Sequence, residues 1–211
     1  MQLVVQAPWL QSGDVDALSA LTRSGFTPLG ATAARWPVEA PITGVDDLCH
    51  SRRLDVAYIP DDRRLADVGI VAFDMDSTLI TIECIDEIAD MQGIKPQVAA
   101  ITTSAMRGEI DFAESLRRRV ALLAGLDESA LQRVYDERLR LSPGVEAMLA
   151  AFRAVGAKTL LVSGGFTFFT ERLRERLGID YTASNVLAAA GGKLRGTIDG
   201  DIVDAKAKAE A

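Results

Sequence analysis

The stretch Val68-Gly-Ile-Val-Ala-Phe73, followed at once by Asp74-Met-Asp-Ser-Thr-Leu79, decides the fold. Its first half is an unbroken apolar run, which is typical of a strand buried on both faces of a parallel sheet. Its second half is a polar cluster placed where that strand ends. Because doubly wound α/β sheets bind ligands beyond the carboxyl ends of their strands, the stretch predicts an α/β fold with a binding site that begins at Asp74.

The residues that follow predict an all-helical insertion and then a return to the sheet. Helices with no strand between them are expected at 83–91, 95–106, 112–123 and 128–141. The later elements are expected to be a strand at 158–162, a helix at 166–177, a strand near 181–187, a hairpin turn at Gly191-Gly192 and a helix that starts after Ile202. The fold class is therefore α/β, a doubly wound parallel sheet interrupted by helices.

A second polar cluster, Ser163-Gly164-Gly165, falls at the end of the strand expected at 158–162. Parallel strands of one sheet end at the same edge, so this cluster should face Asp74 across one crevice, with the helical insertion placed as a lid.

Just after that insertion, Ser142-Pro143 has the pattern of an N-cap followed by proline at the first helical position. It predicts a helix that runs from there to about Val155.

The expected domain organisation has three parts. Residues 1–66 form a small α+β appendage with strands at 2–6 and 55–59 and a helix at 14–24, which we interpret as a remnant of a regulatory domain because it carries no chemical motif. The core comprises residues 67–82 and 142–211. The helical cap comprises residues 83–141.

The composition excludes several classes of function. The chain has 211 residues, with 23 Lys+Arg against 30 Asp+Glu and a net charge of −7, so no basic face for nucleic acid or an anionic membrane is expected. A few local cations or one metal ion could still hold a small anionic substrate. His50 is the only histidine, which excludes histidine-rich zinc sites and makes any Ser-His-Asp triad depend on that one residue.

Cysteine usage and missing motifs narrow the location and the chemistry. Cys49 and Cys84 form no CxxC pair, which favours a reduced, cytoplasmic protein. The sequence holds neither a GxxxxGKS/T loop nor a cysteine followed six residues later by arginine, so P-loop and cysteine-phosphatase chemistry are excluded. The first residues lack a cationic leader, and no run approaches about 18 apolar residues. We therefore expect a soluble cytoplasmic chain, of unknown oligomeric state.

The carboxylate pair Asp74 and Asp76 is the strongest chemical signal. Two carboxylates directly after a buried strand are costly unless a cation neutralises them, and Mg²⁺ prefers hard oxygen ligands and bridges to phosphate. Asp74 could then attack phosphorus while Asp76 transfers protons. The alternative is a strand-end pair that makes Asx-turn or N-cap hydrogen bonds. Ser163 suits an anion at a helix start or only a turn, and Lys206 and Lys208 suit a solvated helix start.

These motifs together resemble those of phosphoserine phosphatases in the haloacid dehalogenase superfamily. The resemblance rests on Asp74-Met-Asp-Ser-Thr-Leu, Glu83-Cys-Ile-Asp-Glu-Ile-Ala, Leu116-Arg-Arg-Arg119-Val-Ala-Leu-Leu, Val162-Ser-Gly-Gly-Phe166 and Ile202-Val-Asp-Ala-Lys-Ala-Lys208. It covers residues 68–211 and does not extend to residues 1–66. The fold that it implies is a haloacid dehalogenase-like core with an inserted helical cap.

The resemblance also implies an activity, the Mg²⁺-dependent hydrolysis of O-phospho-L-serine to L-serine and phosphate, which is the last step of serine biosynthesis. It implies that Asp74 forms an aspartyl-phosphate, that Asp76 is the general acid and base, and that Mg²⁺ binds the Asp74 carboxylate and the main-chain carbonyl of Asp76. The substrate-binding residues that it implies are Glu83 for the ammonium group, Arg119 for the carboxylate, and Ser163, Gly164 and Lys208 for phosphate oxygens. Phosphoryl transfer depends on such positioning and charge neutralisation.

One departure from the family pattern concerns the C-terminal part. The family continues through another strand and an acidic Gly-Asp-Gly-x-Asn-Asp motif that supplies a further Mg²⁺ ligand, and this motif does not occur in the sequence. We therefore expect a truncated, inactive form with an exposed edge at strand 68–73, unless Asp199, Asp201 or Asp204 replaces the missing ligand. Two other functions stay open: another small-metabolite phosphatase or phosphotransferase of the superfamily, and a non-catalytic phosphoserine-binding protein.

Overall fold

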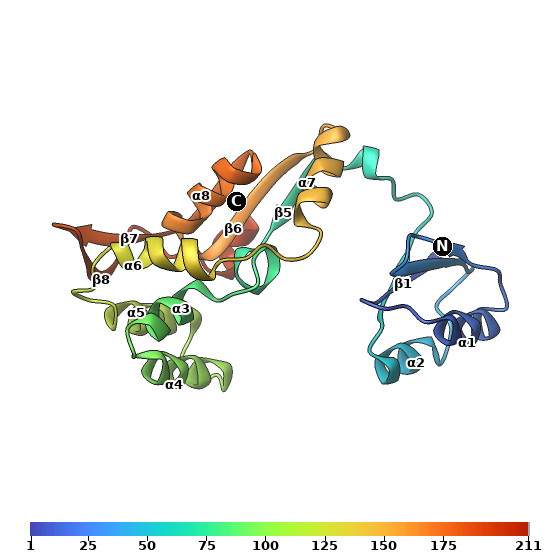
Figure 1. The fold of residues 1–211 in the computed structure, drawn as a ribbon, viewed down its shortest axis with the longest axis horizontal. Helices are drawn as coiled ribbons and strands as arrows, with labels where there is room; N and C mark the ends of the chain where they lie inside the picture. The colour runs from blue at the N-terminus through green and yellow to red at the C-terminus, as the bar shows by residue number, and fades with distance from the viewer. Residues whose placement is uncertain (211) are drawn as a thin grey trace. The chain divides into compact units, whose positions relative to one another are not determined.

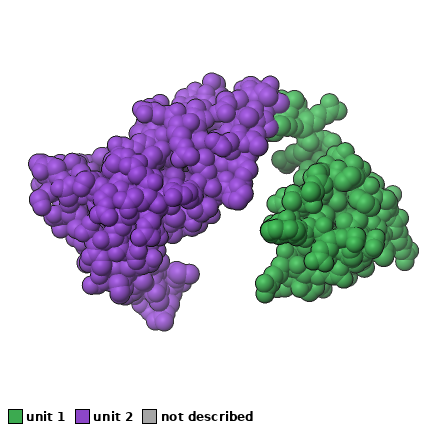
Figure 2. All heavy atoms as spheres, in the orientation of Figure 1, with its two compact units in different colours: residues 1–67 green, residues 68–211 purple. Residues whose placement is uncertain are grey.

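The computed structural model describes residues 1–210, and the chain divides into two compact units, Met1–Asp67 and Val68–Ala211 (Figure 2). Ala211, the last residue of the predicted core, lies outside the described residues. Within the described part of the chain, no helix is long and apolar enough to cross a membrane. Each unit has its own hydrophobic core and is described by itself.

The first unit is a four-stranded antiparallel sheet with two helices. Its elements are β1 (Gln2–Gln6), α1 (Ser12–Thr22), β2 (Thr27–Pro28), β3 (Ala33–Pro37), α2 (Val45–Arg52) and β4 (Asp55–Ile59), with strand order β2-β3-β1-β4. Alternate residues of β1 and β3 are buried, which is the pattern of strands with one covered face. The indole of Trp36 is fully buried, and its Nε1 donates a hydrogen bond to Ser19 Oγ at 2.9 Å. The strands predicted at 2–6 and 55–59 are confirmed.

The second unit is built on a mixed sheet (Figure 1). Its strands are β5 (Ile70–Phe73), β6 (Lys158–Phe166), β7 (Tyr181–Ala190) and β8 (Lys193–Asp199), in that spatial order. The pairs β5–β6 and β6–β7 are parallel, which confirms the predicted parallel core, and β7–β8 is the predicted antiparallel hairpin. The prediction that the 68–73 run is buried on both faces is wrong. The strand is only partly buried, since 57% of Ile70 is exposed. In the described residues β5 is an edge strand paired only with β6, which agrees with the exposed edge expected at 68–73.

Helices supply the rest of the second unit. They are the wide turn η2 (Met75–Leu79), α3 (Cys84–Met91), α4 (Lys95–Met106), α5 (Phe112–Ala121), α6 (Ser129–Arg133), η3 (Val134–Arg138), α7 (Val145–Ala154), α8 (Thr167–Leu177) and α9 (Ala205–Glu210). The short helix η1 (Leu65–Asp67) ends the first unit. Only helices and turns lie between α3 and η3, as the sequence predicts. Both ends of this segment lie side by side, since Thr81 N donates to Arg140 O at 2.9 Å and Ser142 N donates to Leu79 O at 3.0 Å.

One apolar core joins the sheet, the turn η2 and the helices of the second unit. Its fully buried members include Met75 and Leu79 of η2, Ile88 of α3 and Leu161 of β6. Burying a side chain of this size contributes about 1.5–3 kcal/mol to folding. The apolar residues of η2 therefore anchor the turn that carries Asp74 and Asp76 in the hydrophobic core.

Two sequence predictions about helix starts are wrong. Ser142 and Pro143 do not open α7, because Gly144 precedes the helix with a φ of 86° and Val145 N bonds back to Ser142 O in a turn. Ser163 and Gly164 do not open a helix either. They continue β6 as extended backbone, and α8 begins only at Thr167.

Candidate active site

One cavity of about 320 Å³ in the second unit collects every site residue that the sequence predicts. The cavity is lined by Asp74, Asp76, Glu83, Ile85, Phe112, Leu116, Arg119, Ser163, Gly164, Gly165, Phe166, Val203, Asp204, Ala205 and Lys208. These residues come from the turn after β5, the start of α3, one face of α5, the end of β6 and the segment that leads into α9. The carboxyl ends of two neighbouring parallel strands therefore form one wall, and the helical segment forms another.

Asp74 follows β5 directly and stays accessible. Its Oδ1 accepts hydrogen bonds from the backbone N of Met75 at 2.9 Å and from Lys208 Nζ at 3.0 Å. The Asp74 side chain is 48% exposed, so this ion pair is not sealed from the cavity. The bond to Met75 fixes the carboxylate on the turn, and Lys208 offsets its charge.

The turn η2 carries backbone strain that brings Glu83 back toward the Asp pair. Ser77 has a φ of 52°, a left-handed conformation that costs a non-glycine residue about 1–2 kcal/mol. Two hydrogen bonds hold Ser77 there: its N donates to Ile82 O at 3.1 Å, and its Oγ donates to Glu83 Oε1 at 2.7 Å. The strained turn thus places the Glu83 carboxylate at the cavity.

Asp76 is more deeply buried than Asp74. Its Oδ1 accepts a hydrogen bond from the backbone N of Cys84 at 3.0 Å, at the start of α3. Its Oδ2 faces Gly165, since a Cβ placed on that glycine would lie 2.8 Å from this oxygen. Burial raises the pKa of Asp76 to about 6, helped by the charges of Glu83 and Asp74 and opposed by the hydrogen bond from Cys84. A carboxyl of this kind exchanges its proton near neutral pH.

The helix α5 presents one mixed face to the cavity. Phe112, Leu116 and Arg119 lie four and three residues apart, which puts them on one side of the helix. Asp111 caps this helix, because its carboxylate accepts from Glu114 N at 2.7 Å. Burial lowers the pKa of the Arg119 guanidinium, against the opposing pull of nearby carboxylates, of which Asp86 is the strongest and Glu83 and Asp76 follow. Arg119 is thus a partly desolvated cation on the helical wall.

The end of β6 contributes backbone groups and no charge. The parallel ladder with β7 shifts register between Val162 and Phe166, so the residues between them leave the regular pairing. Ser163 is buried, and its Oγ accepts from Gly165 N at 2.9 Å. A Cβ on Gly164 would lie 2.8 Å from Cζ of Phe112, so the Phe112 ring would have to shift to admit any other residue at that position.

Lys208 reaches the cavity from α9, which Asp204 caps. The Oδ1 of Asp204 accepts from the backbone N of Lys206 and of Ala207, each at 2.9 Å. Of the three carboxylates considered as replacement metal ligands, only Asp204 lines this cavity. Asp201 lines a separate one between α5 and β8, and Asp199 ends β8.

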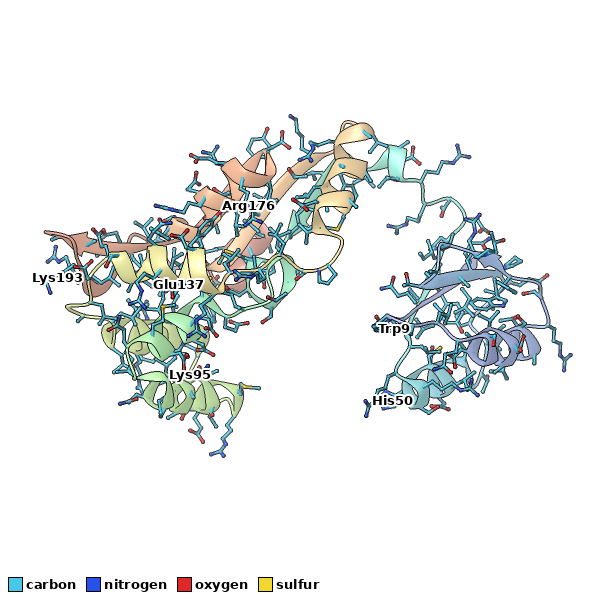
Figure 3. All side chains as sticks on the ribbon, viewed as in Figure 1. Trp9, His50, Lys95, Glu137, Arg176 and Lys193 are labelled. Atoms are coloured by element: carbon cyan, nitrogen blue, oxygen red, sulfur yellow. The ribbon has the colours of Figure 1, made fainter. Side chains whose placement is uncertain are left out.

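The arrangement of His, Cys, Asp and Glu side chains decides whether the described residues alone could hold a metal ion. Within them, no group of three or more His, Cys, Asp or Glu side chains is arranged to hold a metal ion. His50 lies on α2 of the first unit (Figure 3) and does not line the cavity. Asp74 and Asp76 both line the cavity.

Phe112 and Asp204 also line the cavity. The sequence motifs did not predict Phe112 as a site residue, and they suggested Asp204 only as a replacement metal ligand. Phe112 follows the N-cap Asp111, and 42% of it is exposed. A large aromatic at an exposed helix start is the signal that could have identified it. Asp204 stands directly before the predicted helix, where a cap is expected.

Comparison with known proteins identifies the protein family of this chain. Residues 68–209 match the family model of haloacid dehalogenase-like hydrolases, and the chain belongs to this family. A haloacid dehalogenase family hydrolase from Salmonella enterica serovar Typhi superposes with a TM-score of 0.84 at 31% identity, over 99% of this chain and 75% of that one. The structural match therefore includes the first unit, beyond the range of the sequence motifs.

Within the family, the chain is similar to phosphoserine phosphatases. It is 57% identical over 152 residues to the phosphoserine phosphatase of Polaromonas sp., a match that covers 70% of this chain and 64% of that protein. A phosphoserine phosphatase solved as a phospho-aspartyl intermediate analogue superposes with a TM-score of 0.63 at 36% identity, over 68% of each chain. The resemblance predicted from the motifs is confirmed.

Proposed function

We propose that this chain carries the active site of a Mg²⁺-dependent phosphoserine phosphatase. The observation that carries the proposal is the meeting of two sets of charges in one cavity. Asp74, Asp76 and Lys208 lie at the end of the sheet, and Glu83 and Arg119 come from the start of α3 and from α5. The first set suits a phosphate group, and the second suits a zwitterionic amino-acid head.

Substrate recognition divides between the two walls of the cavity. Arg119 binds the substrate carboxylate, because a guanidinium can grip a carboxylate through two parallel hydrogen bonds. Glu83, fixed by Ser77 Oγ at 2.7 Å, binds the ammonium group. Ser163, Gly164 and Lys208 hold the phosphate oxygens. The helical segment of residues 83–141 acts as the cap that brings the amino-acid contacts to the sheet.

Asp74 and Asp76 perform the chemistry in two steps. The Asp74 carboxylate attacks phosphorus, the bond from phosphorus to the serine oxygen breaks, and that oxygen takes a proton from Asp76. Asp76 then accepts a proton from a water molecule that attacks the aspartyl-phosphate, so phosphate leaves and Asp74 is restored. The pKa of Asp76, raised by burial to about 6, supports this role because the group can both give and take a proton near neutral pH.

The proposed metal is Mg²⁺, since phosphatases of this family generally use a divalent ion. The residues present fit it: Asp74 keeps an accessible carboxylate at the cavity, and buried Asp76 lines the same cavity with its pKa raised in part by the charges of Glu83 and Asp74. The Asp74 carboxylate and the main-chain carbonyl of Asp76 would hold the ion, whose charge offsets that of the phosphate oxygens when it is bound.

The test is phosphate release from O-phospho-L-serine with Mg²⁺ or with EDTA, beside phosphothreonine, glycerol phosphate and a sugar phosphate. The chain is assayed as it stands and in an extended form, to which a strand and an acidic Gly-Asp-Gly-x-Asn-Asp loop are added after the last residue. We expect Mg²⁺-dependent hydrolysis that prefers phosphoserine in the extended form, and in the chain as it stands only if Asp204, which lines the cavity, replaces the missing ligand. Equal use of all four phosphates would indicate another small-metabolite phosphatase. Calorimetric binding of phosphoserine without turnover in either form would indicate a binding protein.

We also propose a cytoplasmic location. Both cysteines are free and buried, Cys49 in the first unit and Cys84 beside the cavity. Burial raises the pKa of both thiols, which keeps them protonated and unreactive. This use of cysteine suits a reducing compartment. Fractionation of cells that express the tagged protein would test the location.

A further inference from the structure

We infer that Asn185 is a positioning residue, whose amide ties the end of β6 to the segment that carries Lys208 and so sets Lys208 against Asp74. The inference rests on the proposed function for its catalytic consequence. Asn185 lies on β7 and is 1% exposed. It does not line the cavity, so it acts through other residues.

The Asn185 amide uses both of its ends. Its Nδ2 donates to the backbone O of Gly164 at 2.8 Å, and its Oδ1 accepts from the backbone N of Val203 at 2.8 Å. Each partner belongs to a residue that lines the cavity. One buried side chain therefore bridges two walls of the site. The two residues that it joins, Gly164 and Val203, are 39 residues apart in the sequence.

The local geometry of β6 explains why a side chain is needed at this point. The register of the β6–β7 ladder shifts between Val162 and Phe166, where the chain leaves regular pairing to form the Ser163–Gly165 cluster. A buried carbonyl outside the ladder is costly unless another donor reaches it. Asn185 pairs with Phe166 at the far side of this shift, which puts its amide beside the Gly164 carbonyl.

The other end of the bridge leads to Lys208 within one short helix. Val203 stands two residues before α9, and Asp204 between them caps that helix. Lys208 N donates to Asp204 O at 2.9 Å, and Lys208 Nζ reaches Asp74 Oδ1 at 3.0 Å. Ile202, just before Val203, packs against the apolar core. The bond from Val203 to Asn185 ties the same segment to β7.

The chemistry of this position favours asparagine. Aspartate would keep an acceptor for Val203 N but would turn a second acceptor toward the Gly164 carbonyl. Alanine would leave both backbone groups without the amide. A displacement of about 1 Å in a catalytic group can lower turnover by about 100-fold, so small shifts of Lys208 have a large effect.

The experiment compares Asn185→Ala and Asn185→Asp with Ser184→Ala in the full chain. Ser184 is the matched control, because it is the neighbour on β7 and its Oγ bonds Thr170 Oγ1 at 2.7 Å, away from the cavity residues. The first measurement is amide hydrogen exchange. We expect exchange over residues 203–208 to rise about tenfold or more in both Asn185 variants and to stay unchanged in Ser184→Ala.

The second measurement is phosphoserine hydrolysis. We expect kcat to fall about 10- to 100-fold in Asn185→Ala, with a smaller change in KM and little change in Ser184→Ala. In a Lys208→Ala background, Asn185→Ala should cost much less than it does in the wild type, since a large part of its effect acts through Lys208.

Unchanged exchange over 203–208, or losses of turnover that simply multiply in the double variant, would overturn the inference. If the wild-type chain and its extended form both fail to hydrolyse phosphoserine, the proposed function is wrong. The exchange comparison then decides by itself whether Asn185 holds the segment that bears Lys208.

Discussion

Two carboxylates at opposite ends of the same sheet have pKa values that are shifted in opposite directions. Asp180, beside the first residues of β6, accepts hydrogen bonds from Lys158 Nζ at 2.6 Å, Thr159 N at 3.0 Å and Thr159 Oγ1 at 2.9 Å. The Lys158 bond is the largest of the causes that lower the pKa of Asp180 to about 2. Asp76, at the cavity end, is buried beside two other carboxylates, and its pKa is raised to about 6.

The difference separates a carboxylate that the fold keeps charged from the one that the proposed mechanism uses as acid and base. Around Asp180 the fold supplies a cation and two further donors, so the ionised form is favoured and the group stays charged. Around Asp76 the fold supplies burial and negative charge, with Cys84 N as a single backbone donor. Perturbation of this kind is costly and is typical of functional sites. The predictions below test whether the two ends are as distinct as these contacts indicate.

The largest effect is expected from Asp74→Asn at the cavity end. An amide of the same size cannot form an aspartyl-phosphate, so phosphoserine turnover should fall by at least about 10⁴-fold. Folding should be preserved, since the Asn oxygen can still accept from Met75 N. The measurement is kcat with Mg²⁺, with urea unfolding as the control. Substantial turnover in this variant would remove Asp74 from the mechanism.

A smaller, substrate-selective effect is expected from Arg119→Ala. Loss of a charge-assisted contact to the substrate carboxylate should cost about 2–4 kcal/mol of transition-state stabilisation on phosphoserine. An aryl phosphate such as p-nitrophenyl phosphate has no carboxylate and should lose much less. The comparison of kcat/KM on the two substrates is the measurement. Equal losses would show that Arg119 serves the phosphate or the fold.

The two glycines of β6, Gly164 and Gly165, differ in how easily their neighbours can move to make room for a Cβ. A Cβ at Gly165 would lie 2.8 Å from Asp76 Oδ2 and Met75 Cε, so Gly165→Ala should shift the buried carboxylate and lower kcat about 10- to 100-fold. Gly164→Ala meets only the rim of the Phe112 ring, also at 2.8 Å, and the ring can rotate away. Its loss should be smaller. Gly13→Ala, where nothing lies within 4 Å, is the control. Equal losses at 164 and 165 would contradict this contrast.

Much of the site could be predicted because its signals are local in the sequence. Asp74 and Asp76 stand two residues apart after an apolar run, and Arg119 and Lys208 stand in motifs whose order is fixed. A strand end, a helix period and a motif each need only a few neighbouring residues. The cavity lined by these residues follows from the shared edge of parallel strands.

The misses depended on information that a local pattern does not carry. Ser142-Pro143 looks like a helix start, but the positive φ of Gly144 moves the start to Val145. Asn185 stands in an ordinary strand sequence, and its role depends on a register shift in the neighbouring strand. In each case the deciding partner is set by the three-dimensional fold.

The smallest effect on activity, and a distinct one on stability, is expected from Asp180→Asn. Asparagine keeps the shape but loses the charge that Lys158 Nζ contacts at 2.6 Å, so the urea midpoint should fall at neutral pH while kcat on phosphoserine stays unchanged. The pKa of Asp180 is lowered in the fold, from 3.8 to about 2, so its contribution is present above 3.8 and is lost as the pH falls through about 2. The midpoints of the variant and the wild type should therefore differ at pH 7 and 5 and converge as the pH falls through that window. Lys158→Met should remove most of the difference at every pH, because it deletes the cation that the carboxylate contacts. A loss of turnover in Asp180→Asn, with the midpoint unchanged, would show that the two ends of the sheet are not separate in function.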